Sequence, residues 1–287
     1  MDGIVIVDKP AGWTSQDVVS KLRGVLHTRR IGHGGTLDPM ATGVLPVFVG
    51  RGTRAVEFFE HAEKTYETVL RLGIATDTED ITGEILEKRE VHIYEADFLG
   101  ILPRFRGEIQ QIPPMYSALK INGQKLCDLA RKGREVERQP RTITIHALEC
   151  LEFSGETATL RIHCSKGTYI RTLCKDIGAA LGCGGCMESL RRVTAGAYQI
   201  EEAVPLQTLI DSDHPETYLL PVDSMFTDHP AVTLTEKQEK RCRNGGSFSC
   251  AFADGVYRAY SKDGEFLALS KAENGEFSTI KSFFAVE

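Results

Sequence analysis

The sequence predicts an α+β fold, with a large mixed domain over residues 1–225 and a small β-barrel domain over residues 229–287. Residues 64–73 and 157–164 alternate apolar and polar side chains, as half-buried strands do. Capping residues followed by apolar side chains at helical spacing indicate helices near residues 14–26 and 168–181. After residue 229, short strands are separated by Asp-Gly and Asn-Gly turns, which is typical of a small barrel.

Composition and charge bound the possible functions. The chain has 287 residues, of which 41% are hydrophobic and 26% charged, as in a soluble globular protein. No signal peptide and no membrane-spanning run is expected, and eight cysteines indicate reduced thiols, so we expect a cytoplasmic protein. The net charge is −6, but residues 104–141 carry nine bases against four acids. Such a basic island fits a nucleic-acid surface, and equally an ordinary solvated face.

The first elements can be assigned in order. Residues 3–7 predict a buried strand, and Thr14 or Ser15 can cap a helix with an acid, Asp17, in its first turn. Apolar side chains from Val18 to Leu26 form one helical stripe. Residues 44–50 predict an apolar strand and residues 51–63 a helix.

The segment between these elements is rich in glycine. Residues 32–43 contain four glycines, which allow positive φ and a close approach of backbone to a ligand. Asp38 lies among them, and Pro39 biases it toward an extended backbone. Such a carboxylate can act as a nucleophile, a base or a metal ligand, or it can simply close a turn. No Gly-Lys-Ser/Thr follows, so the segment is not a Walker phosphate loop.

The remaining elements follow the strand at 64–73. Residues 76–84 alternate acids with hydroxyls but lack the glycine and glutamate positions of an EF-hand, so we expect a solvated turn. Helices are expected at 93–102 and 125–131, strands at 141–145 and 157–164, and a helix capped by Thr168. Cys183 and Cys186 have the spacing of a redox or metal pair, but no second pair accompanies them, which favours a glycine turn. Residues 205–223 are expected to close the large domain.

Five motifs in this order resemble those of the TruB family of tRNA pseudouridine synthases. The first is Asp-Lys-Pro-x-Gly-x-Thr-Ser from residue 8, and the second is His33 followed by Gly-Gly-Thr-Leu-Asp-Pro-x-Ala-Thr-Gly. The others are Lys-x-Tyr at 64–66, Lys-Gly-Thr-Tyr-Ile-Arg at 166–171 and Leu-Arg-Arg-x-x-x-Gly at 190–196. Residues 104–140 also resemble the RNA-clamping insertion of the family through Gln-Gln-x-Pro-Pro-x-Tyr-Ser-Ala-Leu-Lys-x-Asn-Gly, although Cys127 replaces an expected aromatic residue.

The resemblance implies a fold and an activity. It implies a pseudouridine-synthase fold with a central, largely antiparallel sheet, a C-terminal PUA-like RNA-binding domain, and isomerisation of uridine 55 in the T arm of tRNA. It implies a monomer that needs no cofactor, no metal and no obligate protein partner. By resemblance the catalytic residues are Asp38, Tyr66 and Arg171, with Arg171 placed to pair with Asp38. The implied substrate-binding residues are Lys9, His33, Thr36, Lys120, Arg131, Tyr169 and Leu190.

Three other functions were weighed against this one. An RNA-binding protein with an inert site is disfavoured because Asp38, Tyr66 and Arg171 are all present. A guide-RNA-dependent synthase is disfavoured by the complete basic insertion and the absence of long charged tails. A glycosidase would need a second acid that the sequence does not identify.

Overall fold

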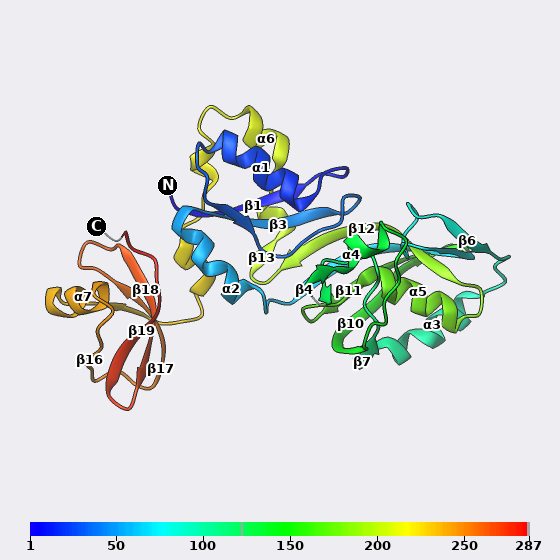
Figure 1. Cartoon of the computed structure of the whole chain (residues 1–287). Coiled ribbons are helices and arrows are strands. Elements are labelled where there is room, and N and C mark those ends of the chain that lie inside the picture. The colour runs from blue at the N-terminus through cyan, green and yellow to red at the C-terminus, as the bar shows by residue number, and fades with distance from the viewer. Residues whose placement is uncertain (122, 286–287) are drawn as a thin grey trace.

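The computed structural model describes residues 1–121 and 123–285, which are built around one large mixed sheet (Figure 1). Its strand order is β14-β1-β3-β12-β4-β11-β10-β7, with β13 paired to β12 and β2 to β3. Only the β1–β14 and β3–β12 pairs are parallel, so the expected largely antiparallel sheet is confirmed. Asn122 of the insertion motif and residues 286–287 of the predicted C-terminal domain lie outside the described residues.

The elements of this part of the chain have the following bounds. The strands of the large sheet are β1 (Gly3–Lys9), β2 (Ile31–His33), β3 (Thr42–Val49), β4 (Lys64–Leu72), β7 (Gly107–Gln111), β10 (Arg141–Phe153), β11 (Thr157–Cys164), β12 (Gly185–Ala195), β13 (Tyr198–Gln199) and β14 (Val204–Pro205). The helices are α1 (Ser15–Val25), α2 (Val56–Phe59), α3 (Glu95–Ile101), α4 (Leu126–Ala130), α5 (Ile170–Ala180) and α6 (Leu206–Asp211). Two hairpins pair β5 (Ile74–Thr76) with β6 (Ile85–Lys88), and β8 (Lys120–Ile121) with β9 (Gln124–Lys125). The 3₁₀ turns are η1 (Gly50–Ala55), η2 (Leu102–Phe105), η3 (Ile200–Glu202), η4 (Pro215–Tyr218) and η5 (Val222–Phe226).

Local sequence explains the best-defined elements. Thr14 caps α1 in a reciprocal capping box, in which its hydroxyl accepts from the Asp17 backbone and Asp17 accepts from the Thr14 backbone. The stripe of α1 is buried in the core through Val18, Val19 and Leu22. In β4 every second side chain, from Lys64 to Leu72, is buried, because the strand turns one face to the core. The predictions for these elements are confirmed.

A second sheet follows the first. Its strands are β15 (Ala231–Thr233), β16 (Phe248–Ser249), β17 (Gly255–Tyr260), β18 (Phe266–Glu273) and β19 (Glu276–Ser282), in the order β15-β17-β18-β19-β16, with α7 (Glu236–Arg243) beside them. The predicted strands are present, and the sheet curls without closing, as a half-barrel (Figure 1). Thr235 and Gln238 form the expected capping box of α7. Phe226 and Phe283 belong to one buried cluster that joins this sheet to β1 and β3.

Three expectations about local structure were wrong. Residues 51–63 form only the turn η1 and the short helix α2, because Gly50 has a φ of +59° and Gly52 packs against the backbone of Gly3. The strand expected at 141–145 continues to Phe153, because β11 pairs with it along that length. Thr168 does not cap α5, since its hydroxyl donates to the carbonyl of Ser165 and Tyr169 is the capping residue.

Cys183 lies in the glycine turn between α5 and β12, and Cys186 is the second residue of β12. Gly182 and Gly184 have positive φ, and Cys183 and Cys186 are buried with free thiols. Within residues 1–121 and 123–285, no three His, Cys, Asp or Glu side chains are placed to hold a metal ion. None of the described helices is long and apolar enough to cross a membrane.

Candidate active site

The glycine-rich segment between β2 and β3 is anchored at both of its sides. Ser15, the first residue of α1, accepts a hydrogen bond from the backbone of Leu37 at 2.8 Å and donates to the Leu37 carbonyl at 3.2 Å. The Pro39 carbonyl accepts from the Gly12 backbone at 2.8 Å, and the Asp38 carbonyl accepts from Ala41 at 3.0 Å. These bonds fix the backbone of Asp38 on both flanks, which is what a reacting carboxylate requires.

Lys9 fastens the same turn to the end of β1. Its buried ammonium donates to the carbonyls of Pro10 (2.9 Å), Trp13 (2.6 Å) and Pro39 (3.2 Å). Burial lowers the pKa of Lys9 to about 8, and the Asp38 carboxylate opposes that change. Lys9 therefore holds the glycine-rich segment through contacts with backbone carbonyls.

Arg171 pairs with Asp38 from the first turn of α5. Its Nε lies 3.0 Å from Asp38 Oδ2, and a second, longer contact joins its terminal nitrogen to Oδ1 at 3.4 Å. The Arg171 side chain is 7% exposed and that of Asp38 34% exposed. A buried guanidinium therefore holds a carboxylate that still has access to solvent and to a ligand.

The rest of the Arg171 guanidinium contacts two other segments of the chain. It donates to the Thr78 carbonyl at 3.1 Å and to the Tyr116 carbonyl at 2.8 Å. The Asp80 carboxylate lies 3.9 Å from it. The β5–β6 turn and the insertion after β7 thus both meet at the arginine that binds Asp38.

The β5–β6 turn is not the solvated turn expected from the sequence. Glu79 and Asp80 are 8% and 6% exposed. One Asp80 oxygen accepts from the Thr78 hydroxyl (2.9 Å) and from the backbone (2.9 Å) and hydroxyl (2.5 Å) of Thr82. The alternation of acids with hydroxyls was the signal of this turn, because hydroxyl donors satisfy buried carboxylates. Asp80 is a second acid near Asp38 that the sequence did not identify, and Arg171 lies between them.

The charges around Asp38 act on its pKa in opposite directions. Burial raises the pKa of the Asp38 carboxyl above its ordinary value, while Arg171 lowers it, Asp80 raises it and Lys9 lowers it. The pKa of the Asp38 carboxyl therefore stays above its ordinary value, and Arg171 and Lys9 limit how far burial raises it.

Tyr66 lies in the core beside a buried arginine. Its side chain points inward from β4, in register with Ile162 of β11 and Arg192 of β12. Burial raises the pKa of the Tyr66 phenol, and the Arg192 cation counters this. Leu190, two residues before Arg192, is 8% exposed and belongs to the same buried cluster as Tyr66 and Leu37.

Arg192 is a functional candidate that the sequence reasoning missed. It is 1% exposed, and it donates to the carbonyls of Val44 (2.7 Å) and Gly35 (3.1 Å), so it supports the glycine-rich segment at one side and β3 at the other. Gly43 has a φ of +100°, and a Cβ there would meet the Arg192 carbonyl. Period-two alternation from Leu190 was the signal that could have placed Arg192 on the buried face.

His33 and Thr36 lie in or beside the glycine-rich segment between β2 and β3, and Tyr169 borders the site. His33 is half-buried at the end of β2, its Nδ1 lacks a hydrogen-bond partner among the described atoms, and burial lowers its pKa. Thr36 is exposed. The Gln111 side chain brackets the backbone of Tyr169, accepting from its nitrogen at 2.8 Å and donating to its carbonyl at 3.0 Å.

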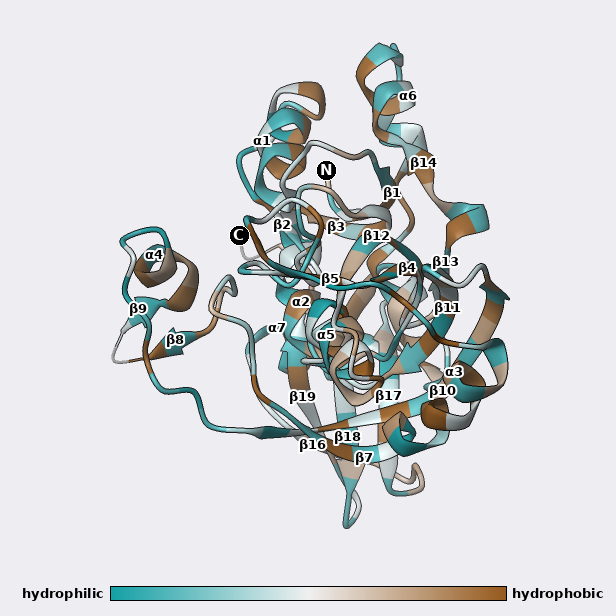
Figure 2. Ribbon diagram, turned by 90° about the vertical axis from the view of Figure 1, so that its right-hand side faces the viewer, coloured by the Kyte–Doolittle hydropathy of each residue, from teal (hydrophilic) through white to brown (hydrophobic). Residues whose placement is uncertain are grey.

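Lys120 and Arg131 are not part of this cluster. Lys120 is exposed in β8, and Arg131, exposed just after α4, pairs with Asp128 at 3.7 Å. Figure 2 shows that β8, β9 and α4 stand off the body of the molecule. The structure thus gathers Asp38, Arg171, Lys9 and Tyr66, and leaves the two insertion cations on a separate arm.

The chain matches two family models and many curated relatives. Residues 23–170 match the model described as TruB family pseudouridylate synthase (N terminal domain), and residues 171–227 match tRNA pseudouridylate synthase B C-terminal domain. The chain is 41% identical to "tRNA pseudouridine synthase B" of Clostridium kluyveri, over 99% of this chain and 100% of that protein. It is 44% identical to the protein of the same name from Dechloromonas aromatica, over 96% of this chain and 93% of that one.

Solved structures show the same fold. A Cbf5-Nop10-Gar1 complex contains a chain that superposes with a TM-score of 0.74 at 26% identity, covering 98% of this chain and 85% of that one. An H/ACA RNP bound to a substrate RNA containing 2′-deoxyuridine gives 0.74 at 24% identity, over 99% and 85% of the two chains. With both family models matching consecutively and relatives aligned along nearly the whole length, this chain belongs to the TruB family of pseudouridylate synthases.

Proposed function

We propose that this enzyme converts the uridine at position 55, in the T arm of tRNA, to pseudouridine without a cofactor. In this isomerisation the N1–C1′ bond breaks, the uracil turns, and C5 bonds to C1′. The hydrogen on C5 leaves as a proton and N1 gains one, so the overall change needs no oxidant and no group donor. The relatives named tRNA pseudouridine synthase B, which align along nearly the whole chain, support tRNA as the substrate.

One observation carries the proposal, the pair formed by Asp38 and Arg171. A carboxylate can start this reaction by adding to C6 of the uracil or by attacking C1′ of the ribose, and both routes need it ionised and aimed. Arg171 contacts both oxygens of Asp38 and is itself held by two backbone carbonyls. Asp38 is therefore the nucleophile or base of the proposal, and Arg171 orients it.

The same reaction suggests a role for each of the other residues around Asp38. The target nucleotide must leave the stacked arm to reach Asp38. His33, on the loop beside Asp38, is the side chain that we propose fills the vacated stack, with Thr36 and Tyr169 along the rim. Tyr66 stacks on the flipped base and its phenol relays a proton, while Leu190 forms an apolar wall.

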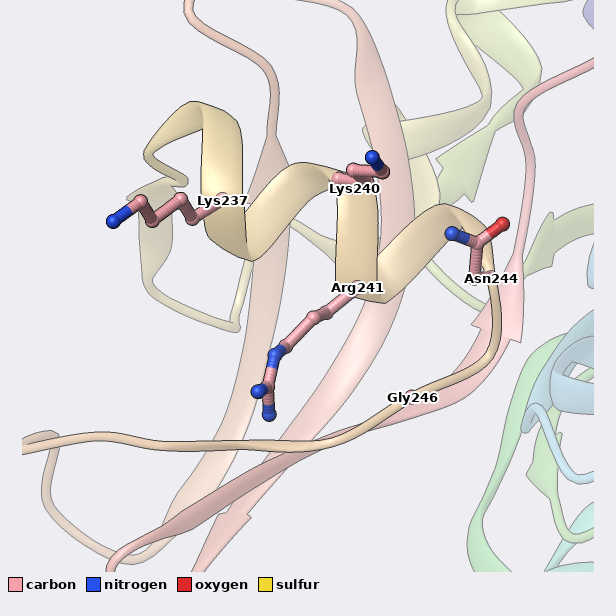
Figure 3. A pocket seen from close by; sticks show the side chains of 5 residues that line it. All are labelled: Lys237, Lys240, Arg241, Asn244 and Gly246. Atoms are coloured by element: carbon pink, nitrogen blue, oxygen red, sulfur yellow. The ribbon is translucent and has the colours of Figure 1, made fainter.

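Two basic surfaces supply the proposed contacts with the tRNA backbone. Lys120 and Arg131 are exposed on the insertion, which carries the excess of bases found at residues 104–141. In the C-terminal domain, α7 and the turn after it border a hollow of about 400 Å³, and Figure 3 shows its lining. The residues are Lys237, Lys240, Arg241, Asn244 and Gly246. Cations in these positions suit phosphate oxygens, which fix position rather than sequence.

The direct test uses an unmodified tRNA transcript with tritium at C5 of its uracils. The wild type should release tritium, Asp38→Asn should not, and a transcript whose position 55 is not uridine should release none. Binding of the transcript without release by the wild type would leave an RNA-binding protein and refute the proposed activity. Lys120→Ala and Arg131→Ala should weaken RNA binding and reduce the slope of log affinity against log salt by about 1 each.

A further inference from the structure

We propose that Glu79 is a positioning residue for the reaction, and that it acts through Lys175 and Thr172 to set Arg171 against Asp38. This inference rests on the proposed function. The Glu79 carboxylate accepts a hydrogen bond from the Thr172 hydroxyl at 2.6 Å and from the Lys175 ammonium at 2.5 Å. Both partners are on α5, at one and four residues beyond Arg171. Glu79 therefore joins the β5–β6 turn to the turn of helix that carries the catalytic arginine.

The backbone of Glu79 shows that this contact is imposed by the fold. Its φ is +65°, in the left-handed region that a residue with a Cβ rarely adopts. Such a conformation persists where surrounding contacts hold it in place. The Glu79 carbonyl accepts from Met187 of β12 at 3.0 Å, and Met187 in turn accepts from Ile81 at 2.9 Å. The backbone of the turn is thus hydrogen-bonded to β12, while the side chain of Glu79 is hydrogen-bonded to α5.

The two neighbours of Glu79 are the residues of the turn that contact Arg171. Thr78 presents its carbonyl to the guanidinium at 3.1 Å, and the Asp80 carboxylate lies 3.9 Å away. A shift of the turn along α5 would move both groups relative to Arg171. Because Glu79 bonds to α5 at Thr172 and Lys175, it fixes this register.

The exposure of the groups fits a positioning role better than a surface ion pair. The Glu79 side chain is 9% exposed and that of Lys175 is 41% exposed. A buried carboxylate with two donors is a directional contact, and removing one donor leaves it under-satisfied. The partners of the Glu79 carboxylate are Thr172 and Lys175 rather than Asp38, so it affects the reaction through the placement of Arg171.

The test combines a titration with a rate, so that it does not depend on the RNA alone. The variants are Glu79→Gln, Lys175→Met, their double variant and Lys175→Arg, with Glu188→Gln as the matched control. Glu188 accepts from Arg71 at 2.6 Å, in an ion pair between β12 and β4 that does not involve Arg171. The Asp38 carboxyl is titrated by ¹³C NMR without RNA, with Asp38→Asn to assign its signal. Single-turnover tritium release and RNA affinity are then measured for each variant.

We expect Glu79→Gln to raise the titration midpoint of Asp38, because a displaced Arg171 lowers that pKa less. The single-turnover rate should fall about tenfold while RNA affinity changes less than twofold, consistent with loss of one charge-assisted bond. Lys175→Met should act in the same direction, the double variant should be less than additive, and Lys175→Arg should stay close to wild type.

An unchanged Asp38 titration in folded Glu79→Gln overturns the proposal, even if its stability falls. Additive effects of Glu79→Gln and Lys175→Met would also overturn it, since the two would then act separately. If the wild type releases no tritium, the proposed activity fails, but the titration of Asp38 still decides whether Glu79 sets its environment.

Discussion

Replacing Arg171 with lysine tests how much of the activity depends on the geometry of the guanidinium rather than on its charge. Arg171 makes four close polar contacts, two to Asp38 and one to each carbonyl of Thr78 and Tyr116, and the Asp80 carboxylate lies farther away, at 3.9 Å. A lysine keeps the charge but not the planar fork, so it cannot reproduce both contacts to Asp38 while also reaching the two carbonyls. At least one bond to the carboxylate is lost.

The expected size of the effect follows from that loss. A hydrogen bond to a charged group contributes about 1.5–3 kcal/mol. If that free energy is lost in the transition state, the Arg171→Lys variant should react roughly 10- to 150-fold more slowly, because about 1.4 kcal/mol corresponds to a tenfold change in rate. RNA affinity should change little, because the Arg171 side chain is only 7% exposed.

The variant also predicts a change in pH dependence. Burial raises the pKa of Asp38 and Arg171 lowers it. In the proposed mechanism the ionised carboxylate is the form that reacts. A lysine farther from the carboxyl lowers its pKa less, so the acid limb of the single-turnover rate should move to higher pH. The assay is rapid-quench tritium release from the tRNA transcript, measured over a pH series that starts below the ordinary pKa of an aspartate carboxyl.

Urea unfolding and RNA binding are the controls for this experiment. A wild-type rate with an unchanged acid limb would refute the role given to Arg171. A rate loss that is matched by weaker RNA binding, with no shift of the acid limb, would do the same, because it would place Arg171 in RNA contact instead.

Three further outcomes are expected. Tyr66→Phe keeps the buried ring but removes the phenol, so RNA binding should persist while the single-turnover rate falls about 100-fold; a rate within threefold of wild type would show that the phenol relays no proton. Asp80→Asn removes a charge that raises the pKa of Asp38, so the acid limb should move to lower pH, opposite to Arg171→Lys, and a shift in the same direction would contradict this reading of the charges. Gly43→Ala places a Cβ against the Arg192 carbonyl at a φ of +100°, and urea unfolding should show a loss of about 3 kcal/mol; a loss below about 0.5 kcal/mol would mean that the loop relaxes freely.

Residue patterns within single elements predicted much of this structure. The capping box of Thr14 and Asp17, the alternating burial of β4 and the box of Thr235 and Gln238 all depend on side chains within a few residues of one another. The C-terminal strands followed from their turn residues in the same way. Propensity is reliable where the partners are local.

The wrong predictions were decided by distant contacts. Residues 51–63 have a helical composition, but Gly52 must fit beneath the carbonyl of Gly3, which a continuous helix would not allow. Thr168 has the type of a capping residue, yet its hydroxyl donates to the Ser165 carbonyl, and the distant Gln111 side chain binds both backbone polar groups of Tyr169, the residue before the helix. The hydroxyls around Asp80 were a local signal of a buried carboxylate, but no local pattern indicated that it would lie beside Arg171, 91 residues later in the sequence.

For the candidate site, most of the residues could be named from the sequence, but their contacts and burial could be read only from the structure. The pairing of Arg171 with Asp38 was expected from the family motifs, and the contact is present at 3.0 Å. Arg192 stood inside a motif that drew attention to Leu190, and its burial depends on the register of β12 with β4. The functions of these residues remain predictions until the variants above are measured.

The hydrogen bond from Arg171 to the Tyr116 carbonyl connects the insertion to the side chain that holds Asp38. RNA binding at the insertion could therefore affect the reaction at Asp38. Tyr116 belongs to the insertion, and its hydroxyl also donates to Asp77 of the β5–β6 turn at 3.3 Å. A guanidinium has five donors at fixed angles, so withdrawing one acceptor changes the balance among the others. Arg171 is thus held by three separate segments: the loop of Asp38, the β5–β6 turn and the insertion. Displacing the insertion would therefore change how firmly Arg171 holds Asp38.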